Sequence, residues 1–299
     1  MTRAKGASLS IQKRHRSSCE RVCERAAKWA QKQPGGHIAI DRALSGLEGL
    51  PRDILIGSFI EPRLEGARVV RRGVTRQLEV DGSVAFALAI TPANIVTPLE
   101  DFALNTLPLR KVRSDFKKAG LENAFGLMKF WTRPSGIPRR YEVYPVIEAI
   151  LYGTGLDQRT LPDLQRRLET RFDARGASVM KFRPIASPKE LSKAAAGLFG
   201  LADAKHENGD TKSWRKSRGL RDYRRLQALA SVPLKQLCLS IGDGDRLLEK
   251  VIVEGKHFVK LACKATAPVI HRDEIPVFMA AELVRLGLTD HRLPFIRVR

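Results

Sequence analysis

The 299-residue chain contains no run of 18 or more apolar residues, so no segment of it is predicted to span a bilayer. The start of the chain lacks the apolar core of a secretory signal, and Glu20 and Glu24 count against an organelle transit peptide. Four cysteines, too few for a disulfide framework, stand at Cys19, Cys23, Cys238 and Cys263. We therefore expect a cytoplasmic protein whose thiols are reduced.

The common catalytic and cofactor motifs are also missing. The sequence holds no P-loop, no G-x-G-x-x-G before a helix, no H-E-x-x-H, no G-x-S-x-G and no H-x-H pair. Cys19 and Cys23 have a C-x3-C spacing with His15 and His37 nearby, but the thiols lie on the apolar stripe of a predicted helix. Packing in the core is favoured over zinc binding there. We expect no metal and no cofactor, and we favour a protein without catalytic activity.

Acidic residues are scarce relative to basic ones. The chain has 32 Asp and Glu against 53 Lys and Arg, a formal net charge of +21. Residues 1–150 carry 25 basic and 15 acidic side chains, net +10, and residues 151–299 carry 28 and 17, net +11. Such self-repulsion destabilises a compact chain unless a polyanion offsets it. The even spread indicates a nucleic-acid partner, RNA or DNA, and no membrane partner is expected.

Hydrophobic residues make up 43% of the chain, which is ordinary for a globular protein, and the length suits two domains or one large one. Periodicity predicts an α+β fold with a strand-rich N-terminal part that includes a β-hairpin, followed by mainly helical middle and C-terminal parts. Four regions are expected: a flexible basic arm at 1–16, a strand-rich α/β region at 17–110, a helical region at 111–205 and a basic linker with a helical C-terminal region at 206–299. A winged helix is one option for the third region.

Individual elements follow from the same patterns. Helices are predicted at 17–33, 113–120, 122–133, 161–172, 187–201, 219–231, 233–240, 244–252 and 275–287. Strands are predicted at 37–41, 53–60, 76–80, 83–90 and 257–263. Asp81-Gly82 supplies the tight turn of the hairpin, and Ser187-Pro188-Lys189-Glu190 is a strong helix start. The segment 145–201 is expected to hold two or three successive helices, with room for a strand between 172 and 187, and 203–213 is the best linker candidate.

The densest basic cluster spans residues 212–225, with seven basic residues in fourteen, one acid, Asp222, and two aromatic rings. Guanidinium groups pair with phosphate oxygens, and aromatic faces stack on unpaired bases. The predicted nucleic-acid contacts in this cluster are Lys212, Trp214, Arg215, Lys216, Arg218, Arg221, Tyr223, Arg224 and Arg225. On a helix, Arg218, Arg221 and Arg225 share one face. The alternative is a solvated helix face with its two rings buried.

Two further stretches combine basic residues with helix or strand patterns. The predicted contacts in them are Lys111, Arg113, Lys117, Lys118, Arg133, Arg139, Arg140, Arg166, Arg167 and Arg171. Phe130, Trp131 and Tyr141 lie among the later members of the first stretch, where they could either stack on bases or belong to the core.

These patterns favour a non-enzymatic nucleic-acid-binding protein that contacts the phosphate backbone. It could be a subunit of a ribonucleoprotein, such as a CRISPR effector or a ribosome-like particle, with other protein subunits as partners. It could equally be a DNA-binding replication or regulatory protein. A third possibility is a basic scaffold that binds an acidic protein.

The rival from another class is a metal-dependent nuclease or other phosphodiester enzyme, with Glu254, Asp243 and Asp245 as its candidate acids. Residues 249–256 resemble the first conserved strand of Toprim domains, in which a glutamate does acid–base work. The chain departs from that family because no Asp-x-Asp pair follows and Phe258 stands where an acid is expected. Asp243-Gly244-Asp245 is also the pattern of a turn that caps the next helix.

Overall fold

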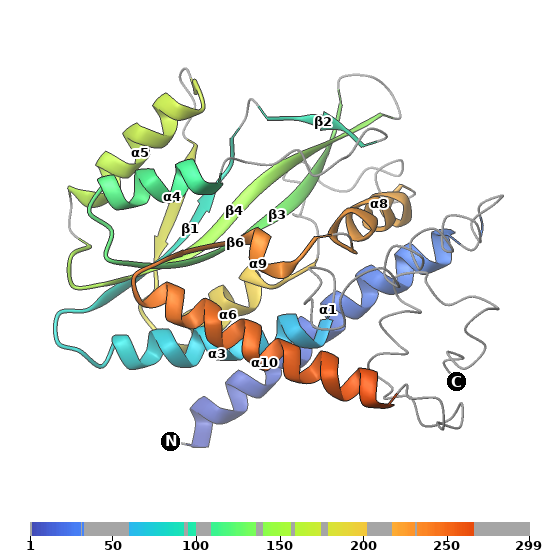
Figure 1. Ribbon diagram of the computed structural model, residues 1–299, viewed down its shortest axis with the longest axis horizontal. Helices are drawn as coiled ribbons and strands as arrows, with labels where there is room; N and C mark the ends of the chain where they lie inside the picture. The colour runs from blue at the N-terminus through green and yellow to red at the C-terminus, as the bar shows by residue number, and fades with distance from the viewer. Residues whose placement is uncertain are drawn as a thin grey trace.

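An antiparallel sheet covered by helices forms the body of the molecule (Figure 1). The computed structural model describes residues 2–30, 32, 60–92, 95–99, 109–135, 140–156, 159–174, 179–201, 217–230 and 232–265. The α+β class is confirmed. None of the helices in these ranges is both long and apolar enough to cross a membrane.

The sheet is built around one long hairpin. The strands of the sheet are β1 (Val84–Ile90), β2 (Thr97–Pro98), β3 (Asn123–Pro134), β4 (Tyr141–Gly153), β5 (Met180–Pro184) and β6 (Cys238–Ile241), and β3 and β4 form the hairpin. They run in the order β5-β1-β4-β3-β6, and β2 pairs with β4 off this path. The β3–β4 register is continuous from Asn123 opposite Tyr152 to Pro134 opposite Tyr141. Residues 149–153 of β4 are all buried, so both faces of the sheet are covered at this end of the hairpin.

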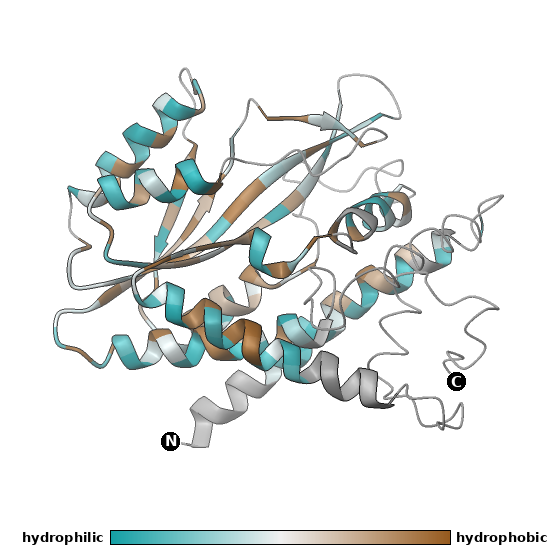
Figure 2. Ribbon diagram, in the orientation of Figure 1, coloured by the Kyte–Doolittle hydropathy of each residue, from teal (hydrophilic) through white to brown (hydrophobic). Residues whose placement is uncertain are grey.

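One face of the sheet carries α3 (Ile60–Gln77) and α6 (Pro188–Leu198). The rings of Phe125 on β3 and Phe199 after α6 stack with their centroids 5.9 Å apart. Around these helices lies α1 (Thr2–Ala30), which contacts α3, α6 and α8 (Arg218–Ala230). The helix α10 (Asp243–Ala265) also contacts α3, and α9 (Leu234–Leu237) is a single turn before β6. Hydrophobic residues run along the sheet and alternate with hydrophilic ones on the helices (Figure 2).

The helices α4 (Leu109–Lys118) and α5 (Thr160–Arg171) pack together on the other side of the sheet (Figure 1). Each presents an apolar stripe to the interior: Val112 and Phe116 from α4, and Leu164 and Leu168 from α5, are fully buried. Arg171 of α5 donates two hydrogen bonds to the buried carboxylate of Asp115 on α4, one of them at 2.6 Å. The pair is therefore fixed by packing and by a bidentate ion pair.

Several predicted elements are confirmed. They include α4, α5, α8, the strand β1, a strand between 172 and 187, and the start of α10 at Asp243. The Ser187 side chain accepts a hydrogen bond from the Glu190 backbone N–H at 3.2 Å, as expected of an N-cap. Cys19 and Cys23 are buried in the core.

Other predictions in the N-terminal part are wrong. The basic arm at 1–16 belongs to α1, in which His15 and Cys19 are buried one turn apart. Residues 60–77 form α3 and not strands, and the first arm of the predicted hairpin, 76–80, is divided between the end of this helix and the turn that follows it. Its buried residues Leu64, Ala67, Val70 and Val74 follow helical spacing. The strands predicted at 37–41 and 53–59 lie outside the described residues.

In the rest of the chain, the main errors are helices predicted where the structure has strands. Residues 122–133 and 145–152 lie in β3 and β4, so 123–153 is the central hairpin and not a run of helices. Residues 233–240 divide between α9 and β6, and the strand predicted at 257–263 is part of α10. The linker at 203–213 and the helix at 275–287 lie outside the described residues.

Candidate nucleic-acid interface

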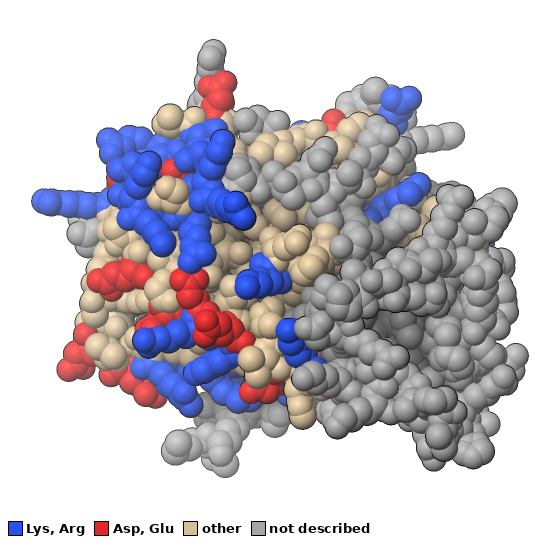
Figure 3. Space-filling view, viewed as in Figure 1, with Lys and Arg blue, Asp and Glu red and all other residues tan. Residues whose placement is uncertain are grey.

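Two helices that are distant in sequence form a basic surface, which we call the α4–α5 patch. Figure 3 shows Lys and Arg gathered over these two helices, at the upper left of the view. Five cations come from α4 and three from α5, against three acidic residues in the same two helices. The patch cations are Arg110, Lys111, Arg113, Lys117, Lys118, Arg166, Arg167 and Arg171. Seven of these eight are predicted contact residues, brought together here from two separate stretches.

Half of the patch cations are held by carboxylates. Arg113 lies 2.7 Å from Asp245, Arg166 and Arg167 both bind Asp163, and Arg171 binds Asp115. Hydrogen bonds from Arg167 and Arg166 lower the pKa of Asp163. Arg166 remains 77% exposed, so it presents most of its surface to a ligand. The pairs of Arg113, Arg166 and Arg167 are partly exposed and can exchange with other anions in water, whereas the pair of Arg171 with the buried Asp115 holds α5 on α4.

The remaining four cations have no such partner. Arg110, Lys111, Lys117 and Lys118 are exposed, and none of them makes a hydrogen bond or ion pair with any residue that the structure describes. Arg110 and Lys118 are the outermost of the four and lie roughly 12 Å apart along the axis of α4. This separation is comparable with the Debye length of about 8 Å at physiological salt, so the fields of neighbouring cations overlap. Such a surface attracts a polyanion.

The positions of these cations on α4 show whether the stability of the helix can account for its positive charge. Lys117 and Lys118 lie in the last turn, where the helix dipole favours positive charge. Arg110 and Lys111 lie in the first turn, which has no acidic residue and where the dipole disfavours a cation by about 0.3–1 kcal/mol each. Helix stability alone therefore does not account for the charge of α4.

Among the residues that the structure describes in α4, in α5 and at their ends, no aromatic ring is exposed beside the cations. Phe116 and Phe172, the aromatic residues of α4 and of the end of α5, are buried at 0% and 3% exposure. The half-buried pair Trp131 and Tyr144, with centroids 6.3 Å apart, lies along β3 and β4. The patch thus offers charge and hydrogen-bond donors without a stacking platform.

Arg133 and Arg140 lie at the far end of the β3–β4 hairpin. Arg133 pairs with Glu142 at 2.9 Å and sits over the Tyr144 ring, 5.6 Å from its centroid. Ten residues of strand separate Arg133 from Asn123, roughly 33 Å at the rise of a strand, whereas α4 and α5 adjoin the Asn123 end. These two arginines are therefore separate from the patch, and Arg139 lies outside the described residues.

The predicted contact face of α8 is turned into the protein. Arg221, Tyr223 and Arg225 are 1%, 7% and 4% exposed. Asp222, the single acid of the cluster, is itself buried and pairs with Arg225 and, at 2.7 Å, with Arg25 of α1. Because a phosphate cannot reach side chains that pack on α1 and β3, we leave these three residues out of the interface.

The same helix carries further contacts that explain this burial. Arg225 donates to the Phe130 carbonyl oxygen at 3.2 Å, and the Arg221 guanidinium lies 5.6 Å from the centroid of the Tyr141 ring. Tyr223 packs on Trp29 of α1 with centroids 5.1 Å apart. Arg218 and Arg224 are half-buried and have contacts of their own. The other four predicted contacts of the cluster, Lys212, Trp214, Arg215 and Lys216, lie outside the described residues.

Two of the three candidate acids of a nuclease, Asp243 and Asp245, have structural roles, and the third, Glu254, is exposed on α10. Asp243 accepts a hydrogen bond from Gln77 at 2.6 Å and begins α10, and Asp245 pairs with Arg113. Residues 249–256 lie in the middle of α10, so the Toprim-like segment is helical and not a strand. Within the described ranges, no group of three or more His, Cys, Asp or Glu residues could hold a metal ion.

Comparison with protein-family models, with curated proteins and with solved structures found no match to this chain. Function is therefore inferred from the chemistry of the described side chains.

Proposed function

We propose that this chain is a non-enzymatic nucleic-acid-binding protein that contacts the phosphate backbone through the α4–α5 patch. The observation that carries the proposal is the set of four exposed cations that form no ion pair with any described residue, two of which stand at the end of α4 where the helix dipole disfavours them. A phosphate backbone would offset both this local cost and the net charge of +21.

The composition of the patch points to backbone contact without base stacking. Lysine and arginine neutralise phosphates on any sequence, and each neutralised phosphate releases condensed counterions. Recognition of unpaired bases needs exposed rings, and the two aromatic residues described in α4 and at the end of α5 are buried. The proposal therefore favours a duplex, of DNA or of RNA, over a single strand. A cytoplasmic location is a separate part of the proposal.

Two biological settings suit such a surface. In one, the protein is a subunit of a ribonucleoprotein assembly; in the other, it is a DNA-binding replication or regulatory protein. Purification of the native protein, followed by identification of the nucleic acid that copurifies, distinguishes these settings.

The test of the proposal is the salt dependence of binding. Fluorescence anisotropy with duplexes of random sequence should show an affinity that falls by about 10³–10⁵-fold between 50 and 200 mM salt if roughly six to ten phosphates are neutralised. A single strand of the same length should bind more weakly. Affinity that does not change with salt would overturn the proposal.

A further inference from the structure

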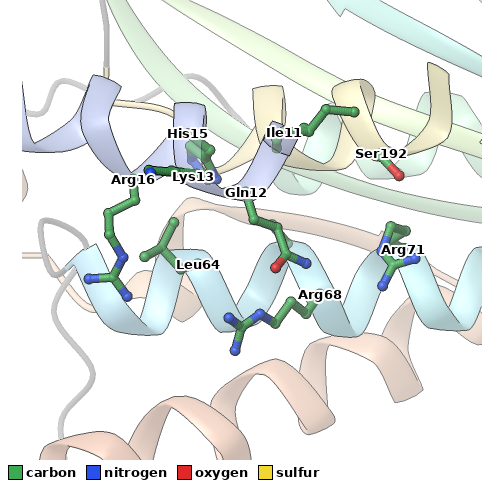
Figure 4. Close-up of a pocket in the computed structure, with 11 residues that line it drawn as sticks. Ile11, Gln12, Lys13, His15, Arg16, Leu64, Arg68, Arg71 and Ser192 are labelled. Atoms are coloured by element: carbon green, nitrogen blue, oxygen red, sulfur yellow. The ribbon is translucent and has the colours of Figure 1, made fainter. Parts of the chain in front are cut away.

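A cavity of about 230 Å³ lies between α1, α3 and α6, on the side of the sheet away from the α4–α5 patch (Figure 4). Residues from the first third of the chain meet residues of α6 there, with Ser192 among the latter. Its volume is below the roughly 300–1,000 Å³ of pockets for drug-sized ligands, so a ligand of this cavity would be small.

The side chains that line the cavity are rich in positive charge. Lys13 and Arg16 come from one face of α1, and Arg68 and Arg71, three residues apart, come from one face of α3. No carboxylate belongs to the described lining. Outside this lining, Glu65 of α3 binds Arg68 at 2.8 Å and contacts the exposed Arg72 at 3.6 Å.

Nε2 of His15 and Nε of Arg71, both from residues that line this cavity, are buried and have no hydrogen-bond partner among the described residues. His15 is only 7% exposed, and it is hydrogen-bonded to the backbone of Phe199. Because burial lowers the pKa of His15 to about 4, the ring is neutral at pH 7 and its free nitrogen is an acceptor. A buried acceptor without a donor is unfavourable, and a ligand with a matching donor group would supply the missing hydrogen bond.

We propose that this cavity binds a small phosphate ester, whose phosphate group is held by Arg68 and Arg71 and one of whose hydroxyl groups donates to Nε2 of His15. Guanidinium groups match phosphate oxygens in charge and geometry, and Lys13 adds a further charge at the rim. Burial and the charges of Arg72 and Arg68 lower the pKa of Arg71, which forms no ion pair with any carboxylate that the structure describes.

A phosphate monoester can be a free small molecule or the terminal phosphate of a polynucleotide. Calorimetric titration of the full chain with ribose 5-phosphate, and with ribose as the control without phosphate, tests the first source. A 5′-phosphorylated oligonucleotide compared with its 5′-hydroxyl counterpart tests the second. Binding that depends on the phosphate in either pair supports the cavity and identifies the source.

The variants locate the binding. Arg71→Gln should weaken phosphate-dependent binding at least tenfold, whereas Arg72→Gln, which removes the same charge from the same helix outside the cavity, should leave it unchanged. Lys13→Gln, at an exposed position on α1, serves as a second cavity variant in case Arg71→Gln does not fold. The absence of phosphate-dependent binding in both ligand pairs, or equal losses in Arg71→Gln and Arg72→Gln, would overturn the proposal without bearing on the patch.

Discussion

Replacement of Lys111, Lys117 and Lys118 by Gln removes three of the exposed cations of the α4–α5 patch and leaves its ion pairs intact. On a DNA duplex each phosphate contact contributes about 0.9 to the slope of log K against log salt concentration. The triple variant should therefore reduce the magnitude of this slope by about 2.7. At about 0.15 M salt each contact is worth about 1 kcal/mol of counterion release, so affinity should fall about 100-fold.

The fold should tolerate this change. Loss of Lys117 and Lys118 removes favourable interactions with the C-terminal end of the α4 dipole, and loss of Lys111 removes an unfavourable one at the first turn. Each of these is about 0.3–1 kcal/mol, so the net effect on the free energy of unfolding should stay within about 1 kcal/mol. Thermal unfolding of the variant measures this directly.

The matched control removes the same number of charges elsewhere. Lys189, Lys235 and Lys250 are exposed on α6, α9 and α10, outside the patch. Their replacement by Gln should leave the salt slope nearly unchanged, as measured by anisotropy over a salt series on one duplex. If both triple variants lose the same slope, or if neither does, the patch is not the site of contact.

Three further outcomes follow from the structure. Asp222→Ala removes the carboxylate that pairs with the buried Arg225. The free energy of unfolding, measured in urea, should therefore fall by about 3–5 kcal/mol. A loss below about 1 kcal/mol would contradict this. Gly244→Ala should also destabilise the protein in urea although alanine favours helices, because the added Cβ would overlap the Ala124 carbonyl oxygen; a more stable variant would refute the close approach. His15 should make the free energy of unfolding depend on pH, because its pKa is about 4 in the folded protein and about 6.5 in the unfolded chain. Between these pH values the unfolded chain binds more protons than the folded protein. The free energy of unfolding should therefore fall by about 3 kcal/mol as pH drops from 6.5 to 4. Replacement of His15 by Gln should flatten this profile.

Local patterns predict those elements whose burial is one-sided. The helix α5 has one apolar stripe, and the α6 start has a capping sequence, so both follow from the sequence. The strand β4 does not, because residues 149–153 are buried whatever face they point to, and the alternation typical of a strand disappears. A continuous apolar run of this kind fits a buried helix equally well.

The candidate interface was predictable only in part. Charge density identified the cations of α4 and α5, but only the packing of these helices shows that they form one surface. The α8 cluster has the same helical spacing whether its face points outward or inward. Asp222 is the one local signal that distinguishes these cases, since a lone acid among arginines can neutralise them in a buried position. The cavity was not predicted, because Lys13 and Arg16 lie in the segment predicted as a flexible arm. Arg68 and Arg71 lie in the region predicted to be rich in strands.

The packing of α1 on α8 also sets an order of events during synthesis. The ion pair of Arg25 with Asp222 and the contact of Trp29 with Tyr223 join residues about 200 positions apart. At about 5–20 residues per second, α1 waits roughly 10–40 s on the ribosome before this partner emerges. During that time α1 is without the α8 surface on which it packs, so nascent chains are open to aggregation until residues 218–230 have emerged.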